Sequence, residues 1–206
     1  FIMVKDLEAV NHTYFVDNVN GVNATGVKGQ RDFPFLTVDY VFSVLTGDGL
    51  DTSPINIIEL VNEGTYPVLT QMPVINVSIR SEYKVTLDYT GATTDLGGDN
   101  SQGNTFEVIM PNGHLKYDST LNQDYERLRN LKINVKTLTT STVNGDLFSW
   151  LLGQTSITCD TLGLYSESLT ANVSNSRINI DSVVIYGGGE KIISKGSSLG
   201  STFNIG

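Results

Sequence analysis

The sequence predicts an all-β fold, because short segments rich in β-branched and aromatic residues follow one another along the chain and turn-forming residues separate them. The turns contain Asn-Gly at 20–21, 112–113 and 144–145, and Gly-rich stretches at 47–49, 97–100 and 187–189. We expect strands at 13–17, 55–61, 73–81, 83–90, 105–110, 130–138, 156–162, 176–187 and 190–196.

One segment near the start of the chain predicts a helix instead. Over 37–45 the apolar residues fall at positions i, i+3, i+4 and i+7, which is the spacing of one helix face. Thr37 is a suitable N-cap, Asp39 adds a negative charge to the first turn, and Pro34 keeps the preceding chain extended. Because the helix is short, it must be stabilised by packing. Its expected core side chains are Val38, Val41, Phe42 and Leu45.

Composition narrows the class of protein. The chain has 206 residues, of which 39% are hydrophobic and 17% charged, so it can form one compact domain with its own core. The net charge of −9 disfavours nucleic-acid binding, since such a surface repels phosphate groups. No apolar run is long enough to cross a bilayer.

A single cysteine, Cys159, excludes an internal disulfide framework and a cysteine-based zinc site within one chain. Its strand-like context, "SITCDTLGL", favours a buried thiol in the core.

The spacing of the expected strands suggests how they are arranged. Apolar residues recur about two positions apart at 128, 131, 133 and 135 and again at 178, 180, 183 and 185, and comparable segments are often about 20–25 residues apart. Such a period is typical of a β-solenoid with loops of variable length. An antiparallel sandwich would also give many short strands, so spacing alone leaves both architectures open.

The order of features over 13–79 is more specific. A strand "TYFVD" leads into a loop containing Asn20 and Gly21, "PFLTV" opens the helix, and a later strand ends in "GTY" before the next strand. This order resembles the N-terminal part of right-handed parallel β-helix proteins of the pectin-lyase-like class. The chain differs from that pattern in a longer loop between Leu45 and Ile55, which inserts "LDTSP". The matching residues are Tyr14, Phe15, Val16, Asp17, Pro34, Phe35, Thr37, Val38, Ile57, Leu60, Gly64, Thr65, Tyr66, Val74, Val77 and Ile79.

The resemblance implies a single β-helix domain over 1–206, with an N-terminal cap and first rung at 13–72 and further rungs with inserted loops at 73–206. A solenoid end exposes unpaired strand groups and an open core, so the short helix is expected to cap it, with Phe33 and Phe35 closing the core. An ordinary helix in an α+β domain is the alternative. We also expect the chain to be a fragment of a longer protein or its other end to be covered in an assembly.

Few residues suggest catalysis or metal binding. Hydrolysis of a glycan would need two facing carboxylates, and the later acidic residues lie in no recognisable pair, so we expect solvated turn carboxylates. "TDLGGDN" at 94–100 offers oxygen ligands for calcium without the alternation of a calcium loop, and we expect a turn. The two histidines, His12 and His114, are expected at the surface or in turns, and Trp150 in the core or a subunit contact. The acidic residues considered are Asp95, Asp99, Glu107, Asp118, Asp124, Glu126, Glu167 and Asp181.

We therefore assign no catalytic, cofactor-binding or metal-binding residue and expect no cofactor. The resemblance and the acidic, cysteine-poor, Thr/Ser/Asn-rich composition suggest a viral structural protein, such as a phage fibre, spike or decoration subunit. It would be a trimer, located in a virion or outside the cell, that contacts other virion proteins and a host surface polysaccharide. A polysaccharide lyase or glycoside hydrolase of the same fold and a bacterial glycan-binding adhesin are the alternatives.

Overall fold

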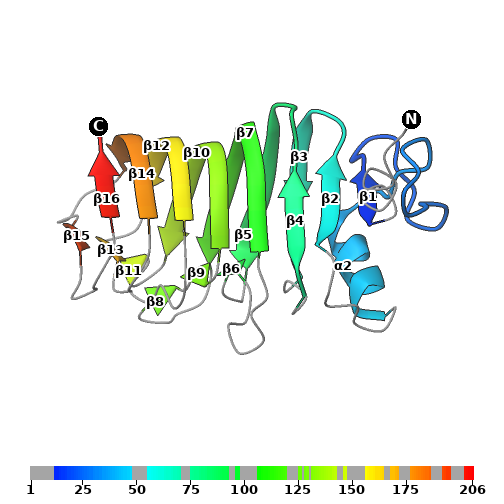
Figure 1. Ribbon diagram of the computed structural model, residues 1–206, viewed down its shortest axis with the longest axis horizontal. Helices are drawn as coiled ribbons and strands as arrows, with labels where there is room; N and C mark the ends of the chain where they lie inside the picture. The colour runs from blue at the N-terminus through cyan, green and yellow to red at the C-terminus, as the bar shows by residue number, and fades with distance from the viewer. Residues whose placement is uncertain are drawn as a thin grey trace, which may run out of the picture.

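The described part of the chain consists of β-strands stacked along one long axis, with one helix near one end (Figure 1). The computed structural model describes residues 12–47, 55–70, 75–92, 96–97, 106–119, 125–126, 128–129, 131–142, 146–147, 156–164, 168–171, 177–186, 192–195 and 202–206. The elements are β1 Thr13–Val16, α2 Val38–Gly47, β2 Asn56–Leu60, β3 Gly64–Pro67, β4 Val77–Arg80, β5 Val85–Ala92, β6 Leu96–Gly97, β7 Phe106–Ser119, β8 Tyr125–Glu126, β9 Leu128–Arg129, β10 Leu131–Thr142, β11 Asp146–Leu147, β12 Ser156–Leu164, β13 Ser168–Ala171, β14 Arg177–Ile185, β15 Ile192–Lys195 and β16 Thr202–Ile205.

Every pairing between the described strands is parallel. The main sheet has the order β1-β2-β4-β7-β10-β12-β14-β16, and β3 and β5 join it beside β7. Smaller sheets have the orders β15-β13-β11-β8 and β6-β9. These pairings confirm the all-β prediction and exclude the antiparallel sandwich for the described strands.

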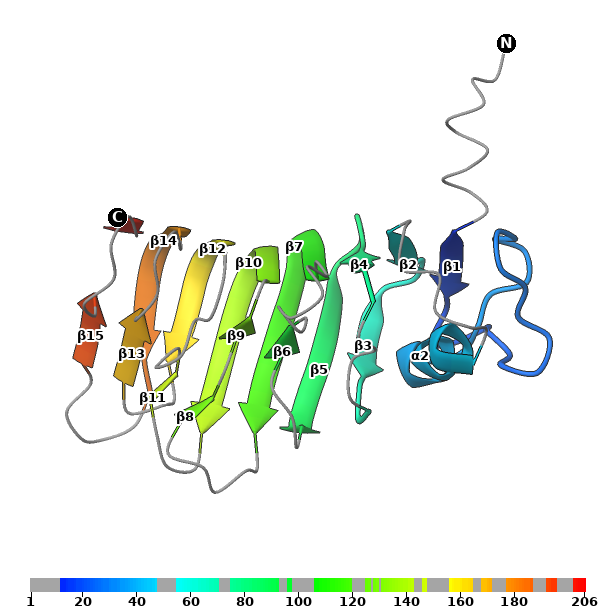
Figure 2. The ribbon, with the colours of Figure 1, turned by 60° about the horizontal axis from the view of Figure 1, so that its bottom comes forward.

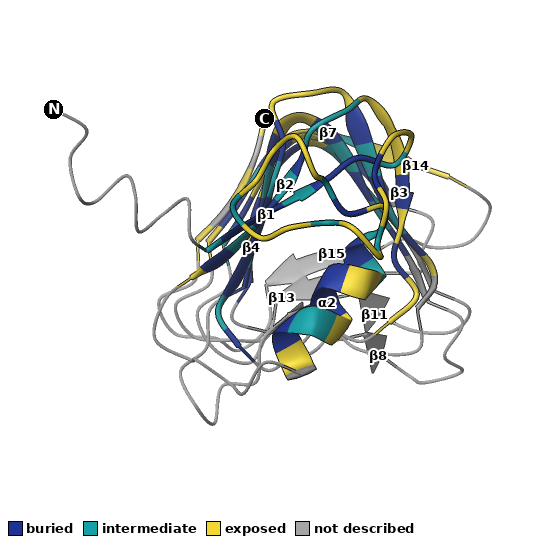
Figure 3. Cartoon of the chain, turned by 90° about the vertical axis from the view of Figure 1, so that its right-hand side faces the viewer, coloured by how far each residue is buried: buried dark blue, intermediate teal, exposed yellow. Residues whose placement is uncertain are grey.

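The main sheet is bent. The chain crosses this sheet repeatedly, and we call each crossing a pass. Successive passes change direction at the same place along the sheet. The first half of β7 pairs with β4 and its second half pairs with β5, and these two strands are separated only by residues 81–84. In the view along the long axis, the strands on the two sides of the bend face each other (Figure 3). Figure 2 shows the short strands β8, β11, β13 and β15 on the remaining side.

The interior is built from rows of identical or similar side chains, one from each pass. Because the pairing is parallel and in register, equivalent positions of neighbouring strands lie side by side and point to the same face. Burying each of these aliphatic side chains stabilises the fold by about 1.5–3 kcal/mol. There is one buried row on each side of the bend. The row before the bend consists of Ile58, Ile79, Val108, Ile133, Ile157 and Ile178. The row after the bend consists of Leu87, Leu115, Leu138 and Leu162.

Cys159 belongs to this interior, as predicted, and is 2% exposed. Burial, together with the nearby carboxylates of Asp160 and Asp181, raises the pKa of its thiol to about 12. The thiol is therefore protonated and unreactive at neutral pH, which fits a packing role.

Helix α2 closes the open side of the bent sheet near the N-terminal end (Figure 3). The predicted N-cap is confirmed, since the Thr37 hydroxyl accepts a hydrogen bond from the Tyr40 amide at 3.2 Å. The Asp39 carboxylate accepts hydrogen bonds from the amides of Leu69 and Thr70, which ties the helix to the segment after β3. The predicted core face is also confirmed, since Val38, Val41, Phe42 and Leu45 are all buried.

Of the two phenylalanines expected to close the core, Phe35 is buried and Phe33 is not. Phe35 is 4% exposed and packs its ring 6.0 Å from that of Tyr14, whereas Phe33 is 53% exposed. The backbone of Phe35 hydrogen-bonds to Phe15 and Asp17 beside β1, which directs its side chain inward. Phe33 instead lies in a loop, where its backbone forms hydrogen bonds with Gln30 and Val27. Of these two phenylalanines, only Phe35 therefore helps to close the core.

Three other local predictions need correction. The Asn-Gly at 112–113 is not a chain reversal but a bend inside β7, where three residues oppose Lys136 alone in β10. The charged sequence "DYERLRNLK" at 124–132 suggests a loop or a helical turn, but this segment contains the strands β8 and β9 and the start of β10. The predicted strand at 105–110 continues to Ser119, because the bend does not interrupt pairing. The Asn-Gly at 144–145 and Trp150 lie outside the described residues.

Asp17 fixes the turn that follows β1. Its carboxylate accepts hydrogen bonds from the amides of Val19 and Asn20 and from the side chains of Asn20 and Asn62, at 2.9–3.3 Å. Burial raises the pKa of Asp17, but these hydrogen bonds to its charged form outweigh burial and hold the pKa below its ordinary value. The same turn requires Gly21, whose missing Cβ would lie 2.1 Å from the carbonyl oxygen of Phe35.

We predict that Phe35→Ala destabilises the N-terminal end by about 3–5 kcal/mol, since it removes a buried aromatic ring and leaves a cavity. Hydrogen exchange of the β1 and α2 amides would measure the loss as faster exchange. The matched control Phe33→Ala should change the exchange free energy by less than about 0.5 kcal/mol. Equal effects of the two substitutions would contradict the assigned packing.

Asp17→Asn should destabilise the same end by about 1–2 kcal/mol at pH 7, because hydrogen bonds to a charged acceptor weaken. The pKa of Asp17 is lower in the folded state than in the unfolded state. The stabilisation is therefore fully present at pH values above the unfolded-state pKa and is lost as the pH falls through the folded-state pKa. Urea unfolding of both proteins from pH 7 to pH 2 should therefore converge in acid. The exposed control Asp32→Asn should run parallel to the wild type, and a pH-independent gap for Asp17→Asn would refute the explanation.

Candidate functional site

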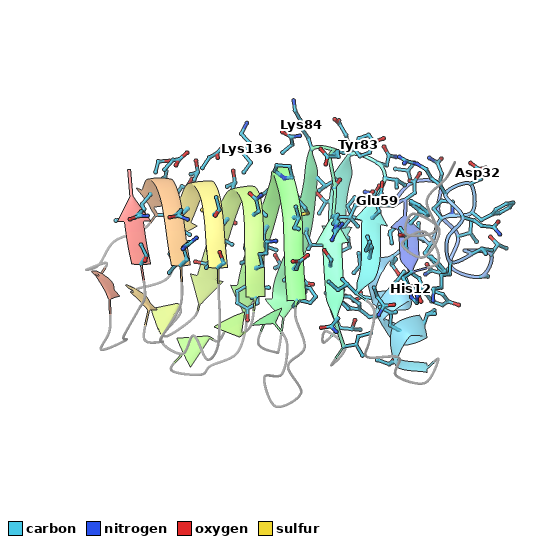
Figure 4. All side chains as sticks on the ribbon, in the orientation of Figure 1. His12, Asp32, Glu59, Tyr83, Lys84 and Lys136 are labelled. Atoms are coloured by element: carbon cyan, nitrogen blue, oxygen red, sulfur yellow. The ribbon has the colours of Figure 1, made fainter. Side chains whose placement is uncertain are left out.

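The outer side of the bend contains a small polar groove. It has a volume of about 210 Å³ and lies where the chain enters β5 and where β7 and β10 bend. Lys84 and Lys136 extend from the same side of the molecule in Figure 4. The groove is lined by Lys84, Val85, Thr86, Asn112, Gly113, His114, Lys136 and Thr137.

Parallel register brings these residues together from distant parts of the sequence. Thr86, His114 and Thr137 are direct partners across β5, β7 and β10 and form an outward row. The bend displaces Asn112 and Lys136 to the rim, where the Asn112 side chain donates a hydrogen bond to the Glu82 carbonyl at 3.0 Å. This contact links two successive passes of the chain at the edge of the groove.

His114 is half-buried in the floor of the groove, so it lies at the surface, one of its two expected positions, but in the middle of a strand and not in a turn. Its Nε2 lies 2.7 Å from the Thr139 hydroxyl, a hydrogen-bond distance. Burial lowers the pKa of the imidazole, Asp88 raises it and Lys116 lowers it, with a net decrease below the ordinary value. His114 is therefore neutral at pH 7 and can donate or accept a hydrogen bond.

The neighbouring carboxylate of Asp88 is already engaged. It accepts hydrogen bonds from the amide and hydroxyl of Thr90 and forms an ion pair of 3.5 Å with Lys116. Burial raises its pKa, but the contacts with Thr90 and Lys116 outweigh burial and keep the pKa below its ordinary value. The contacts of the Asp88 carboxylate are with Thr90 and Lys116 and not with the His114 imidazole, so among the described residues Asp88 and His114 do not form the carboxylate–imidazole pair of a hydrolase triad.

Glu107, considered above as a hydrolytic acid, lies near the start of β7 and not in a solvated turn. Its carboxylate is 13% exposed and is held by Lys132 at 3.3 Å, by Arg80 at 3.5 Å and by the Ser78 hydroxyl at 3.0 Å. These contacts occupy both carboxylate oxygens. Glu107 is better explained as a link across β4, β7 and β10.

The other expected site residues are not gathered into one place. Asp181 is exposed in β14, and His12 precedes β1, where its carbonyl accepts the Ile57 amide. Asp118 and Glu126 lie in β7 and β8. Among the described residues, no group of three or more His, Cys, Asp or Glu side chains could hold a metal ion. The candidate site residues that lie outside the described part of the chain are Asp95, Asp99, Asn100, Asp124 and Glu167.

A second cavity, of about 270 Å³, lies beside the start of α2. It is lined by Asn18, Leu36, Thr37, Val38, Thr65, Tyr66 and Pro67. The Asn18 side-chain nitrogen donates a hydrogen bond to the Thr65 carbonyl and Thr37 caps the helix, whereas the buried Asn18 Oδ1 has no hydrogen-bond partner among the described residues.

Comparison of the chain with models of protein families, with curated proteins and with solved structures finds no match. No helix in the described segments has the length and apolar character needed to cross a membrane. The site must therefore be interpreted from its own geometry.

The groove is suited to binding. It offers two ammonium groups, an amide, an imidazole and two hydroxyls on a rigid sheet, and none of the described residues that line it carries a carboxylate. No motif in the sequence marks Lys84, Asn112 or Lys136 as site residues. The signal that could have identified them is the recurrence of polar residues at the bend of successive passes, which becomes visible only once the register is known.

We predict that Glu107→Ala destabilises the protein by about 1–2 kcal/mol, because it leaves Arg80 and Lys132 as neighbouring like charges and removes a hydrogen bond to Ser78. Urea unfolding would measure the change. Lys132→Ala, which removes one exposed partner, should cost less than half as much. A larger loss for Lys132→Ala would show that Glu107 is not the centre of this network.

Proposed function

We propose that the chain is a right-handed parallel β-helix of the pectin-lyase-like class and serves as a structural subunit of a viral fibre or spike that attaches to a host surface. The observation that carries this proposal is the repeated in-register pairing of β2, β4, β7, β10, β12 and β14 in one direction. Parallel neighbours in one sheet need crossover connections, which are almost always right-handed.

The outer face supports a structural role. One outward row consists largely of uncharged polar side chains, and the Asn204 amide donates a hydrogen bond to the Asn179 side chain at 2.8 Å. Outward charges nearer the centre are paired, as with Glu107 and Lys132 or Asp88 and Lys116. A stack of this kind is rigid because each pass is fixed by both neighbours. The row continues through Asn134, Thr158, Asn179 and Asn204.

Attachment to a surface polysaccharide fits the same face. Sugars are bound by convergent hydroxyl, amide and imidazole groups, which the groove at the bend supplies on a fixed scaffold. Glycan cleavage by a hydrolase is less well supported, since Glu107 is engaged by two cations and a hydroxyl. We therefore favour binding without cleavage. A bacterial adhesin would use the same surface.

The assembly state tests this function. We expect the native protein to be an elongated trimer or a larger virion-associated species, measured by light scattering and electron microscopy. Association should persist on dilution to nanomolar concentration, because fibre subunits form permanent interfaces. A stable monomer with no association with particles would refute the structural role.

A further inference from the structure

We propose that the groove at the bend binds an oxyanion, namely a carboxylate, sulfate or phosphate group carried by a surface glycan. This deepens the proposed attachment function and rests on it. The groove is lined by Lys84, Lys136 and His114, and by the side chains of Asn112, Thr86 and Thr137.

The charge of the groove differs from that of the whole chain. The protein has a net charge of −9, so most of its surface repels anions. Lys84 and Lys136 are exposed and form no ion pair with another described residue, whereas Lys116 and Lys132 are both paired with carboxylates. Two lysines without carboxylate partners, brought to one cavity from β10 and the start of β5, form a local site for a negative group.

The neutral groups complete the site. The Asn112 amide, anchored through its contact with Glu82, and the hydroxyls of Thr86 and Thr137 can donate hydrogen bonds to oxygen atoms. His114 lies in the floor, and its ring is oriented by Thr139. This set can bind the charged oxygens of an acidic sugar together with its hydroxyls, whereas an uncharged sugar would leave both lysines unused.

One charged group should bind weakly, in the millimolar range, because the lysines are exposed and solvent screens them. A polymer with repeated anionic groups, held by several copies of the chain, would bind more tightly through multivalency. Acidic glycan oligomers are therefore better probes than single sugars.

The experiment uses the imidazole proton resonances of the protein, because the chain has two histidines and each can be followed separately. Galacturonate oligomers, sulfated dextran oligomers and inorganic phosphate would be titrated, with uncharged dextran oligomers as the neutral probe. We expect the acidic oligomers to shift the His114 signals and leave those of His12 unchanged. A larger shift with galacturonate than with sulfated dextran would assign the group as a carboxylate, and the reverse order would assign it as a sulfate.

The variants are Lys84→Gln, Lys136→Gln and the double substitution. Each single change should weaken binding about threefold and the double change at least tenfold, with unchanged thermal midpoints because both side chains are exposed. Lys28→Gln, which makes the same charge change in the N-terminal loop, should leave binding unaltered.

The proposal is overturned if no acidic oligomer shifts His114, if both histidines shift equally, or if the double variant binds as the wild type does. Equal binding of uncharged dextran would overturn the oxyanion site while leaving glycan attachment intact. A trimeric, virion-associated protein without acidic-glycan binding would likewise separate the two proposals. Binding of inorganic phosphate alone would overturn the glycan as its carrier.

Discussion

In-register parallel pairing of successive strands is the constraint on which the rest of the structure depends. It places Ile58, Ile79 and Val108 in one buried row, with the same position repeated in later strands, so that each pass covers the apolar side chains of its neighbours. It also places outward residues in rows, so polar side chains meet equivalent side chains. A shift by one residue would turn every apolar side chain in a strand outward, which makes the register strongly specified.

The bend follows from the same constraint and creates the groove. At the bend, three residues of β7 oppose Lys136 alone in β10, and in-register pairing of the two strands resumes on both sides of this mismatch. Because backbone pairing continues on both sides of the bend, the groove residues are held on a rigid sheet. Binding groups at such a position lose little conformational freedom when a ligand is bound. The polar groove and the apolar interior are thus two results of one register.

Much of the fold could be predicted from local patterns, and most of the site could not. Helical spacing and capping identified the buried face of α2 and the role of Thr37, because these signals lie within one turn of chain. Phe33 and Phe35 look alike in sequence, but only Phe35 hydrogen-bonds beside β1, a contact with a distant segment. Lys84, His114 and Lys136 become neighbours only through the register. No local sequence pattern therefore predicts that these three residues are neighbours.

Disulfide cross-linking between outward positions of three consecutive strands tests the parallel register most directly. Asn134, Thr158 and Asn179 are register partners in β10, β12 and β14, and Cys159 would first be replaced by alanine. Adjacent parallel strands lie about 4.8 Å apart, within disulfide reach, whereas strands two apart are about 9.6 Å apart and beyond it. Asn134→Cys with Thr158→Cys, and Thr158→Cys with Asn179→Cys, should therefore cross-link rapidly under mild oxidation, while Asn134→Cys with Asn179→Cys should remain reduced. Failure of both adjacent pairs, or rapid cross-linking of the distant pair, would contradict the stacked parallel arrangement.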